Sequence, residues 1–174
     1  MTLHDLEKKN ESDVRWVFKS LVVHPEVGTL PAQAGCAALK QGKFWQMEAG
    51  IFDGLWDVSG EDPAVRDKSV ITQDGLEAIA TKVGLDLTQF RNDMGGKECA
   101  EFLQKNGELL EKLGVHATPS FYINGRFVGG AVPEEEFQKI IDEEKAKADA
   151  AYKTGVKPED YYNTIVRNGK KSLE

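Results

Sequence analysis

The chain has 174 residues, of which 40% are hydrophobic and 29% are charged, and this composition suits one compact globular domain with a substantial core. Its formal net charge of -7 opposes binding to phosphate backbones and acidic membrane surfaces, so we expect no nucleic acid and no membrane among its partners. No apolar run is long enough for a membrane span, and the polar start predicts no export signal in the chain as written.

The first third of the chain predicts a helix, a buried strand and an irregular connection. Residues 2–9 have a short helical pattern, and residues 13–21 are rich in β-branched and aromatic side chains. Pro25 and Gly28 interrupt the stretch that follows, so we expect an irregular connection with the next helix beginning at Pro31.

A helical block is predicted from residue 31 to residue 113. Small residues over 31–41 permit close helix packing, and apolar residues recur at helical spacing after Gly42. We expect the aromatic side chains of that second helix to lie in the core: Phe44, Trp45, Phe52 and Trp56. An exposed loop is predicted over 57–69, followed by helices over 72–83, 87–92 and 97–113.

Strand character returns at residues 120–123, where Asn124-Gly125 predicts a tight turn into a second strand over 126–128. Pro133 and three acidic residues then favour the start of a helix that continues toward Gly155. A last short helix is predicted over 158–167. The order strand, helical insert, hairpin and helix is typical of a mixed sheet covered by helices.

Three stretches of the sequence resemble one protein family. Residues 113–125, LGVHATPSFYING, resemble the family segment in which a Thr-Pro peptide enters a strand that ends in an Asn-Gly hairpin. Residues 41–47, QGKFWQM, resemble the start of a helix in the family's insert, and residues 83–90, VGLDLTQF, resemble a later helix junction. Over about residues 2–148 the chain thus resembles the DsbA-like thioredoxin-fold oxidoreductases.

The resemblance implies an α/β fold: a thioredoxin-like fold with a large helical insertion, incomplete at the N-terminus. We expect one domain over residues 1–174, with the helical insert at about 31–113 and a C-terminal helical extension at about 156–169. In the family, the proline matching Pro119 follows a cis peptide that exposes the backbone to substrate. The resemblance therefore implies a cis Thr118-Pro119 bond and substrate binding by His116, Ala117, Thr118 and Pro119.

The family's catalytic CxxC is absent from this sequence. Cys36 and Cys99 are the two cysteines, and their separation excludes CxxC chemistry and Cys-rich zinc binding. Cys36 lies among alanines and is expected to behave as a small buried hydrophobe. Cys99, near a predicted helix start, is a weak catalytic candidate, and a passive or partly exposed thiol is favoured for it. No metal-ligand spacing appears among the histidines, and we expect no metal and no cofactor.

The family strand that precedes CxxC is also missing, and in the family it lies between the strands matching residues 14–21 and 120–123. Unpaired backbone groups in a core cost about 1–3 kcal/mol each, so an open gap in a monomer is disfavoured. Three solutions remain open: a truncated start, direct pairing of the two flanking strands, or exchange of elements between two chains. For the chain as given, we expect a homodimer.

Three functions remain open at this point. The first is a thiol–disulfide oxidoreductase that acts on protein thiols and disulfides, with its dithiol upstream and little dithiol activity in this chain. The second is a non-catalytic peptide-binding or scaffold domain that keeps the groove beside Pro119. The third is a glutathione-using relative with serine in place of the first cysteine. Family resemblance implies a periplasmic location.

Overall fold

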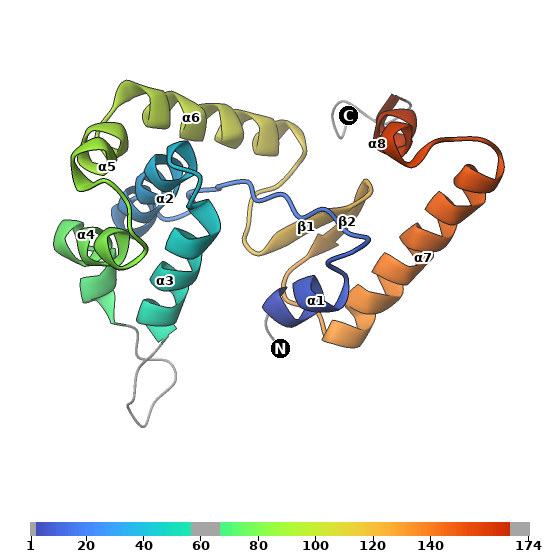
Figure 1. Ribbon diagram of the computed structural model, residues 1–174, viewed down its shortest axis with the longest axis horizontal. Helices are drawn as coiled ribbons and strands as arrows, with labels where there is room; N and C mark the ends of the chain where they lie inside the picture. Colours follow the sequence, from blue (N-terminus) through green and yellow to red (C-terminus); the bar gives the residue numbers. More distant parts are fainter. Residues whose placement is uncertain (1–2, 57–66, 168–174) are drawn as a thin grey trace. The chain divides into compact units, whose positions relative to one another are not determined.

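The computed structural model describes residues 3–56 and 67–167. The chain forms two compact units, one of residues 1–19 with 110–174 and one of residues 20–109. Figure 1 labels the helices and strands of both units. The boundary at residue 110 falls within one long helix, α6, which runs from Lys97 to Lys112.

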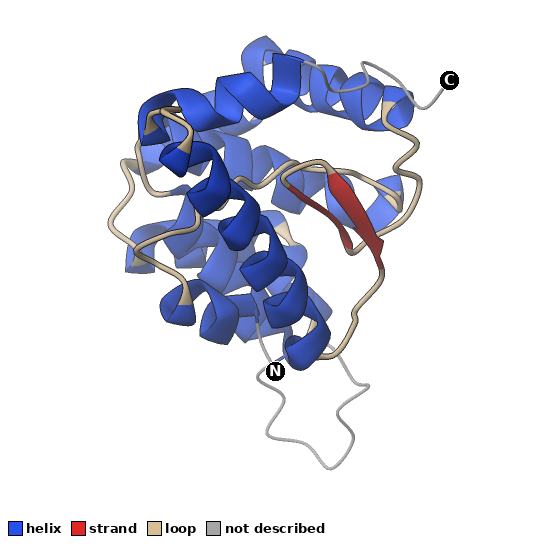
Figure 2. Ribbon diagram, turned by 90° about the vertical axis from the view of Figure 1, so that its right-hand side faces the viewer, coloured by secondary structure: helices blue, strands red, loops and turns tan. Residues whose placement is uncertain are grey.

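The first unit is built on a β-hairpin and helices on either side of it in the sequence. It contains α1 (Leu3–Lys9), β1 (Ser120–Ile123), β2 (Arg126–Gly129), α7 (Glu134–Lys153) and α8 (Pro158–Arg167). Figure 2 shows the two strands, which pair antiparallel with Ile123 opposite Arg126. Asn124 and Gly125 both have positive φ, as a tight primed turn requires, so the predicted hairpin is confirmed.

One face of this hairpin forms the core of the first unit. Leu6 from α1, Val128 from β2 and Phe137, Ile140 and Ile141 from α7 are buried together. Phe121 and Ile123 of β1 pack against them, because alternate residues of a strand face the same side.

The segment predicted as a buried strand over residues 13–21 is not a strand in the structure. Val14 and Trp16 pack against the core of the first unit, whereas Arg15 and Val17 are exposed, so the alternation of a strand is present without its pairing. Among the described residues, Arg15, Trp16 and Val17 make no backbone hydrogen bond, and β1 pairs with β2 alone. Direct pairing of this segment with β1, one of three open solutions, is therefore absent.

The second unit is helical. It contains α2 (Pro25–Lys40), α3 (Phe44–Trp56), a 3-10 turn η1 (Lys68–Ile71), α4 (Gln73–Lys82), α5 (Leu87–Met94) and the larger part of α6. The predicted helices over 72–83, 87–92 and 97–113 are confirmed. A core of small and large side chains joins the first four helices: Ala34, Ala37, Ala38, Met47, Ile51, Leu76, Ala80, Leu85, Phe90 and Met94.

Two of the stretches that carried the family resemblance are hydrogen-bonded to each other in this unit. Lys43 Nζ donates to the carbonyl oxygens of Val83 and Gly84, at 2.8 and 2.7 Å, at the C-terminus of α4. Gln41 accepts from the backbone N–H of Asp86 at 2.9 Å and donates to its carbonyl at 3.1 Å. The two stretches therefore fix the loop between α4 and α5 against the turn between α2 and α3.

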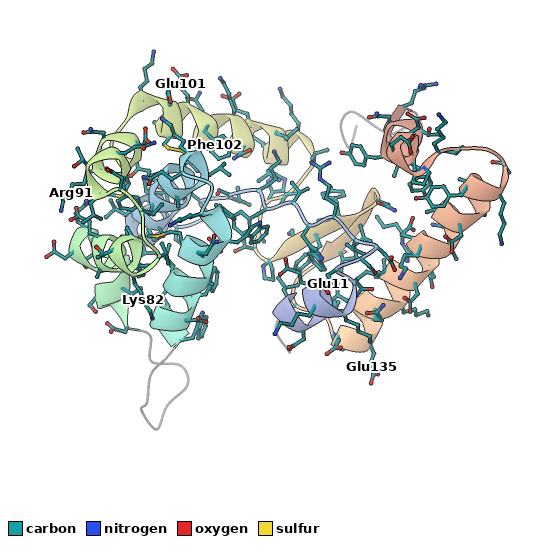
Figure 3. All side chains as sticks on the ribbon, in the orientation of Figure 1. Glu11, Lys82, Arg91, Glu101, Phe102 and Glu135 are labelled. Atoms are coloured by element: carbon teal, nitrogen blue, oxygen red, sulfur yellow. A yellow bond between two sulfur atoms is a disulfide. The ribbon has the colours of Figure 1, made fainter. Side chains whose placement is uncertain are left out.

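An ion pair also joins α4 and α5 at the surface of this unit. Arg91 of α5, labelled in Figure 3, pairs with Glu77 of α4. This hydrogen bond lowers the pKa of Glu77 to about 2. Asp86 and Thr72 cap the N-termini of α5 and α4 by accepting from backbone N–H groups, so capping residues define both helix starts.

Two further predictions for the second unit were wrong, and part of a third lies outside the described residues. The helix expected at Pro31 begins at Pro25, whose missing N–H costs nothing at a first helical position, and Pro31 lies inside the helix. The aromatic side chains of α3 are not all in the core, because Trp45, Phe52 and Trp56 are about half exposed. Residues 57–66 of the predicted loop lie outside the described residues.

Candidate functional site

The candidate site is the segment that leads from α6 into β1, in the first unit. The backbone N–H of Val115 donates to the carbonyl of Leu110 and ends the helix, and the Val115 side chain is buried. The next four residues, 116–119, are all exposed. The bond between Thr118 and Pro119 is cis. The four residues predicted to bind substrate therefore form one exposed segment that is held at both ends.

Among the described residues, hydrogen bonds fix this segment but leave the backbone groups of Thr118 unpaired. Ser120 Oγ donates to the carbonyl of Ala117 at 2.6 Å, and the backbone N–H of Gly130 donates to the carbonyl of Pro119 at 2.8 Å. In the described part of the chain, the N–H and C=O of Thr118 make no hydrogen bond. An exposed residue with both backbone groups free can pair with another extended chain.

The free backbone groups continue along β1. In an antiparallel hairpin, alternate residues direct their N–H and C=O groups away from the partner strand. Ile123 lies opposite Arg126 next to the turn, so the groups of Tyr122 and Ser120 point away from β2. Together with Thr118 they form an open backbone edge. No other described strand pairs with it.

Two aromatic side chains lie beside this edge. Tyr122 and Phe127 are opposite each other in the hairpin register, with ring centroids 5.3 Å apart, and both are exposed. Tyr122 also donates its hydroxyl hydrogen to the carbonyl of Leu113 at 2.6 Å. Sequence reasoning did not single out this pair, although the Asn-Gly turn fixes the register and makes residues 122 and 127 neighbours.

The opposite face of the hairpin holds the site in place. Phe121 packs edge-on against Phe137 of α7, with ring centroids 4.8 Å apart. Arg126 pairs with Glu143 of α7, and this hydrogen bond lowers the pKa of Glu143. Glu144, which is buried, pairs with Lys147 at 2.6 Å and with Arg126 at 3.5 Å. The hairpin is thus fixed to α7 by an aromatic contact and by ion pairs.

The two cysteines form a disulfide, contrary to the prediction of free thiols. Cys36 of α2 and Cys99 of α6 are bonded, with their Cα atoms 5.7 Å apart, and the described residues contain no free cysteine. Cys99 is fully buried, so the partly exposed thiol expected there is absent, and a bonded, buried sulfur is not an available nucleophile. The bond joins two residues that are 63 positions apart in the sequence.

The histidines do not gather into a site. His24 lies at the N-terminus of α2 and is exposed, whereas His116 lies beside Thr118 in the first unit. The described residues contain no group of His, Cys, Asp and Glu side chains that could hold a metal ion. None of the helices in that part of the chain has both the length and the apolar character that crossing a bilayer requires.

The helix-rich architecture and the exposed Thr118–Pro119 segment agree with the thioredoxin-fold class that the sequence resemblance implies. A family model described as thioredoxin matches residues 3–143, and the chain belongs to this family. The crystal structure of a thioredoxin-like oxidoreductase from Silicibacter pomeroyi DSS-3 superposes with a TM-score of 0.63 at 28% identity, over 83% of this chain and 77% of that one. The fold is therefore thioredoxin-like, as predicted, with a large helical part and a small sheet.

Curated relatives narrow the class further. The chain is 36% identical to a probable disulfide bond formation protein D of Bacillus anthracis and 32% identical to that of Bacillus cereus, over 68% of this chain and 52% of each relative. It is also 25% identical to a Na(+)/H(+) antiporter NhaA of Herminiimonas arsenicoxydans, over 79% of this chain and 20% of the antiporter. The chain thus spans about half the length of the Bacillus relatives. The DsbA-like resemblance is confirmed.

Proposed function

We propose that this chain supplies the substrate-binding side of a thiol–disulfide oxidoreductase and binds extended segments of proteins that carry thiols or disulfides. The carrying observation is the open backbone edge of Thr118, Ser120 and Tyr122 beside the exposed Pro119. The names of the Bacillus relatives, which concern disulfide bond formation, support protein thiols as the substrate class.

Binding at this edge follows from main-chain chemistry. A peptide that adds a strand to a sheet gains hydrogen bonds common to every sequence, and pockets for alternate side chains add preference. Tyr122 and Phe127 offer an apolar surface next to the edge, which favours substrate segments with apolar side chains. Such segments are exposed in unfolded proteins and buried in folded ones. The proposed substrate is therefore an unfolded or partly folded protein.

We propose little or no dithiol exchange by the chain as given. Exchange requires a thiolate that attacks a disulfide and a second thiol that resolves the mixed disulfide. The described residues contain no free cysteine, and the exposed segment at residues 116–119 contains none in sequence. We expect the rate of insulin reduction by dithiothreitol to be the same with and without the chain. A clear acceleration would contradict this part of the proposal.

Binding is tested with a fluorescent, carboxymethylated insulin B chain, measured by anisotropy. We expect saturable binding, and a peptide with N-methylated central residues should bind at least about tenfold more weakly, because each methyl group removes a strand hydrogen bond. Equal affinity for the two peptides would exclude binding at a backbone edge.

Site-directed variants distinguish peptide binding at the aromatic surface from non-specific hydrophobic binding. Phe127→Ser should weaken binding of the unmethylated peptide by about tenfold, since an aromatic contact contributes about 1–2 kcal/mol. Tyr162→Ser on α8 is the matched control, because Tyr162 is also an exposed aromatic, at 64% against 52% for Phe127. Equal losses in both variants would indicate non-specific binding.

We further propose that two copies associate through the unpaired backbone of the first unit. Within the described part of the chain, the extended segment at Arg15, Trp16 and Val17 offers free N–H and C=O groups that are separate from the proposed peptide-binding edge. Free strand edges favour association with a second chain. Val17→Pro removes one donor from the segment and should shift the dimer toward monomer, whereas Val17→Ala should not. A monomer in light scattering at micromolar concentration would contradict the dimer.

We also propose that the two units act as one DsbA-like domain in an oxidising compartment such as the periplasm. A disulfide between two buried cysteines supports this location, because disulfides persist in oxidising compartments and are rare in the cytosol. The proposal is tested by alkylating the protein in intact cells of its source. Rapid labelling of both thiols without prior reduction would contradict it.

A further inference from the structure

The Cys36–Cys99 disulfide joins a packed helical core to a helix that contributes little to it. The described core of the second unit takes its side chains from α2 to α5, and none of them comes from α6. Within this unit α2 packs closely against α3 and α5, and in the described part of the chain α6 has no comparable packing against any of these helices. The N-terminal part of α6 is therefore held mainly by the disulfide and by neighbouring polar contacts.

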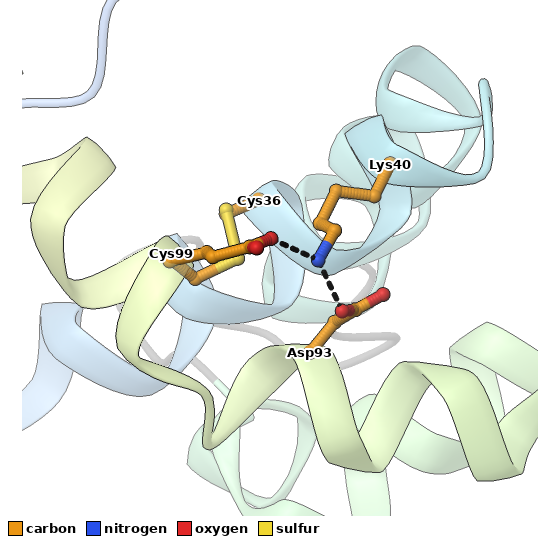
Figure 4. The surroundings of a disulfide bond; sticks show 5 residues. Cys36, Lys40, Asp93 and Cys99 are labelled. Carbon is orange, nitrogen blue, oxygen red and sulfur yellow. Dashed lines mark hydrogen bonds and ion pairs between the residues drawn. A yellow bond between two sulfur atoms is a disulfide. The ribbon is translucent and has the colours of Figure 1, made fainter.

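Figure 4 shows these polar contacts around the disulfide. Lys40, one turn after Cys36 on α2, ion-pairs with Asp93 of α5 and, at 2.6 Å, with Glu98 at the start of α6. The Lys40 side chain is about one third exposed and that of Glu98 is largely exposed. Exposed ion pairs contribute little to stability, about 0–1 kcal/mol in general. The disulfide is thus the strongest interaction that joins α2 to α6.

We propose that this disulfide is a redox-controlled cross-link between α2 and α6. A dithiol reductant opens the disulfide and frees the N-terminal part of α6, while the core of α2 to α5 stays folded. The proposal does not depend on substrate binding at Pro119. It assigns the two cysteines a regulatory role that is separate from catalysis on substrates.

Exposure and helix position determine which sulfur is attacked. Cys36 exposes 6% of its surface to solvent and Cys99 exposes none, so a reductant reaches Cys36 first. Cys99 is the third residue of α6, where the positive end of a helix stabilises a thiolate, whereas Cys36 lies within α2. Cys99 is therefore the better leaving group.

The reaction is an ordinary two-step exchange. A thiolate of the dithiol attacks Cys36 Sγ, the bond to Cys99 breaks, and its electron pair leaves on Cys99 Sγ, which takes up a proton. The second thiol of the reductant then displaces Cys36 as a thiol. The protein gains two electrons and two protons, and the dithiol becomes a disulfide.

Hydrogen–deuterium exchange of the full chain tests the release. With dithiothreitol present, we expect amides in α6 near residues 99–103 to exchange at least about tenfold faster, while amides of α4 change little. A Cys36→Ser/Cys99→Ser variant should show the same pattern without reductant. Unchanged exchange in α6, or an equal increase throughout α2 to α6, would overturn the proposal.

The direction of attack is tested with glutathione. The protein is treated briefly with the monothiol, quenched with N-ethylmaleimide and mapped by mass spectrometry. We expect glutathione on Cys36 and N-ethylmaleimide on Cys99. The reverse assignment would overturn the proposed leaving group.

Discussion

Glu48 of α3 provides the sharpest test of the helical unit. Burial raises the pKa of its carboxyl group from the ordinary 4.5 to about 7. Desolvation favours the neutral form of an acid, because a charge loses its hydration in a less polar environment. Glu48 therefore holds its proton more tightly in the folded chain than in the unfolded chain, and it makes the chain less stable as pH rises.

The sign and size of this effect follow from proton linkage. Well below pH 4.5 the carboxyl group is protonated in both the folded and the unfolded chain, so it does not change the free energy of unfolding. Between pH 4.5 and about 7 the unfolded chain loses the proton first, so the free energy of unfolding falls as pH rises. A pKa of about 7 in place of 4.5 means that ionisation in the folded chain costs about 3 kcal/mol more than in the unfolded chain, and this full cost applies well above pH 7. Glu48→Gln should remove this cost.

Urea unfolding at a series of pH values measures the effect. The free energy of unfolding of Glu48→Gln minus that of the unmodified chain should be small near about pH 4 and rise to about 3 kcal/mol near about pH 8. Asp53→Asn on the same helix is the control, since Asp53 is exposed. A difference that does not change with pH would refute the assignment of a partly buried carboxyl group that stays neutral.

Three further variants, one of them a double substitution, test the packing of the same unit. Cys36→Ala/Cys99→Ala removes a bond that closes 63 residues, and chain entropy predicts a loss of about 4 kcal/mol in urea unfolding. Lys43→Met removes two hydrogen bonds to the end of α4 and should cost about 1–2 kcal/mol, measured in the same way; no loss would contradict the capping role. Phe90→Ala, at a fully buried position, should lower stability by about 3–5 kcal/mol and the calorimetric Tm accordingly; a loss below about 1 kcal/mol would contradict its place in the core.

Features fixed by local chemistry were predicted correctly from the sequence. The Asn124-Gly125 turn needs two residues with positive φ and thereby sets the strand register. The helices predicted over 72–83 and 87–92 begin at Gln73 and Leu87, directly after the capping residues Thr72 and Asp86. Each of these signals lies within a few residues of the structure it determines.

Features that depend on distant partners were not predictable in the same way. No local pattern links Cys36 to Cys99 across 63 residues, because their meeting depends on how α2 and α6 lie in the fold. The spacing of the aromatic residues of α3 placed them on one face of a helix, but this spacing does not show whether another element packs against that face. Trp45, Phe52 and Trp56 therefore lie about half exposed where a core position was expected.

The segment around Trp16 shows the same limit for strands. Its β-branched and aromatic residues favour an extended chain, and the alternating exposure of residues 14–17 shows that the chain is extended. A strand also requires a neighbour for its backbone groups, and composition does not supply one. The proposed binding residues 116–119 were located only through the family resemblance, whereas the hairpin next to them follows from its turn.

The two units differ in how completely their backbone groups are paired, and this difference predicts which unit a bound strand stabilises. In the described part of the chain, the helical unit has its own core and a covalent bond between helices. In the described residues of the first unit, the backbone groups are unpaired from Arg15 to Val17 and along the outer edge of β1. A ligand stabilises the state whose free groups it pairs. A strand-forming peptide or a second copy should therefore raise the stability of the first unit and leave that of the helical unit nearly unchanged.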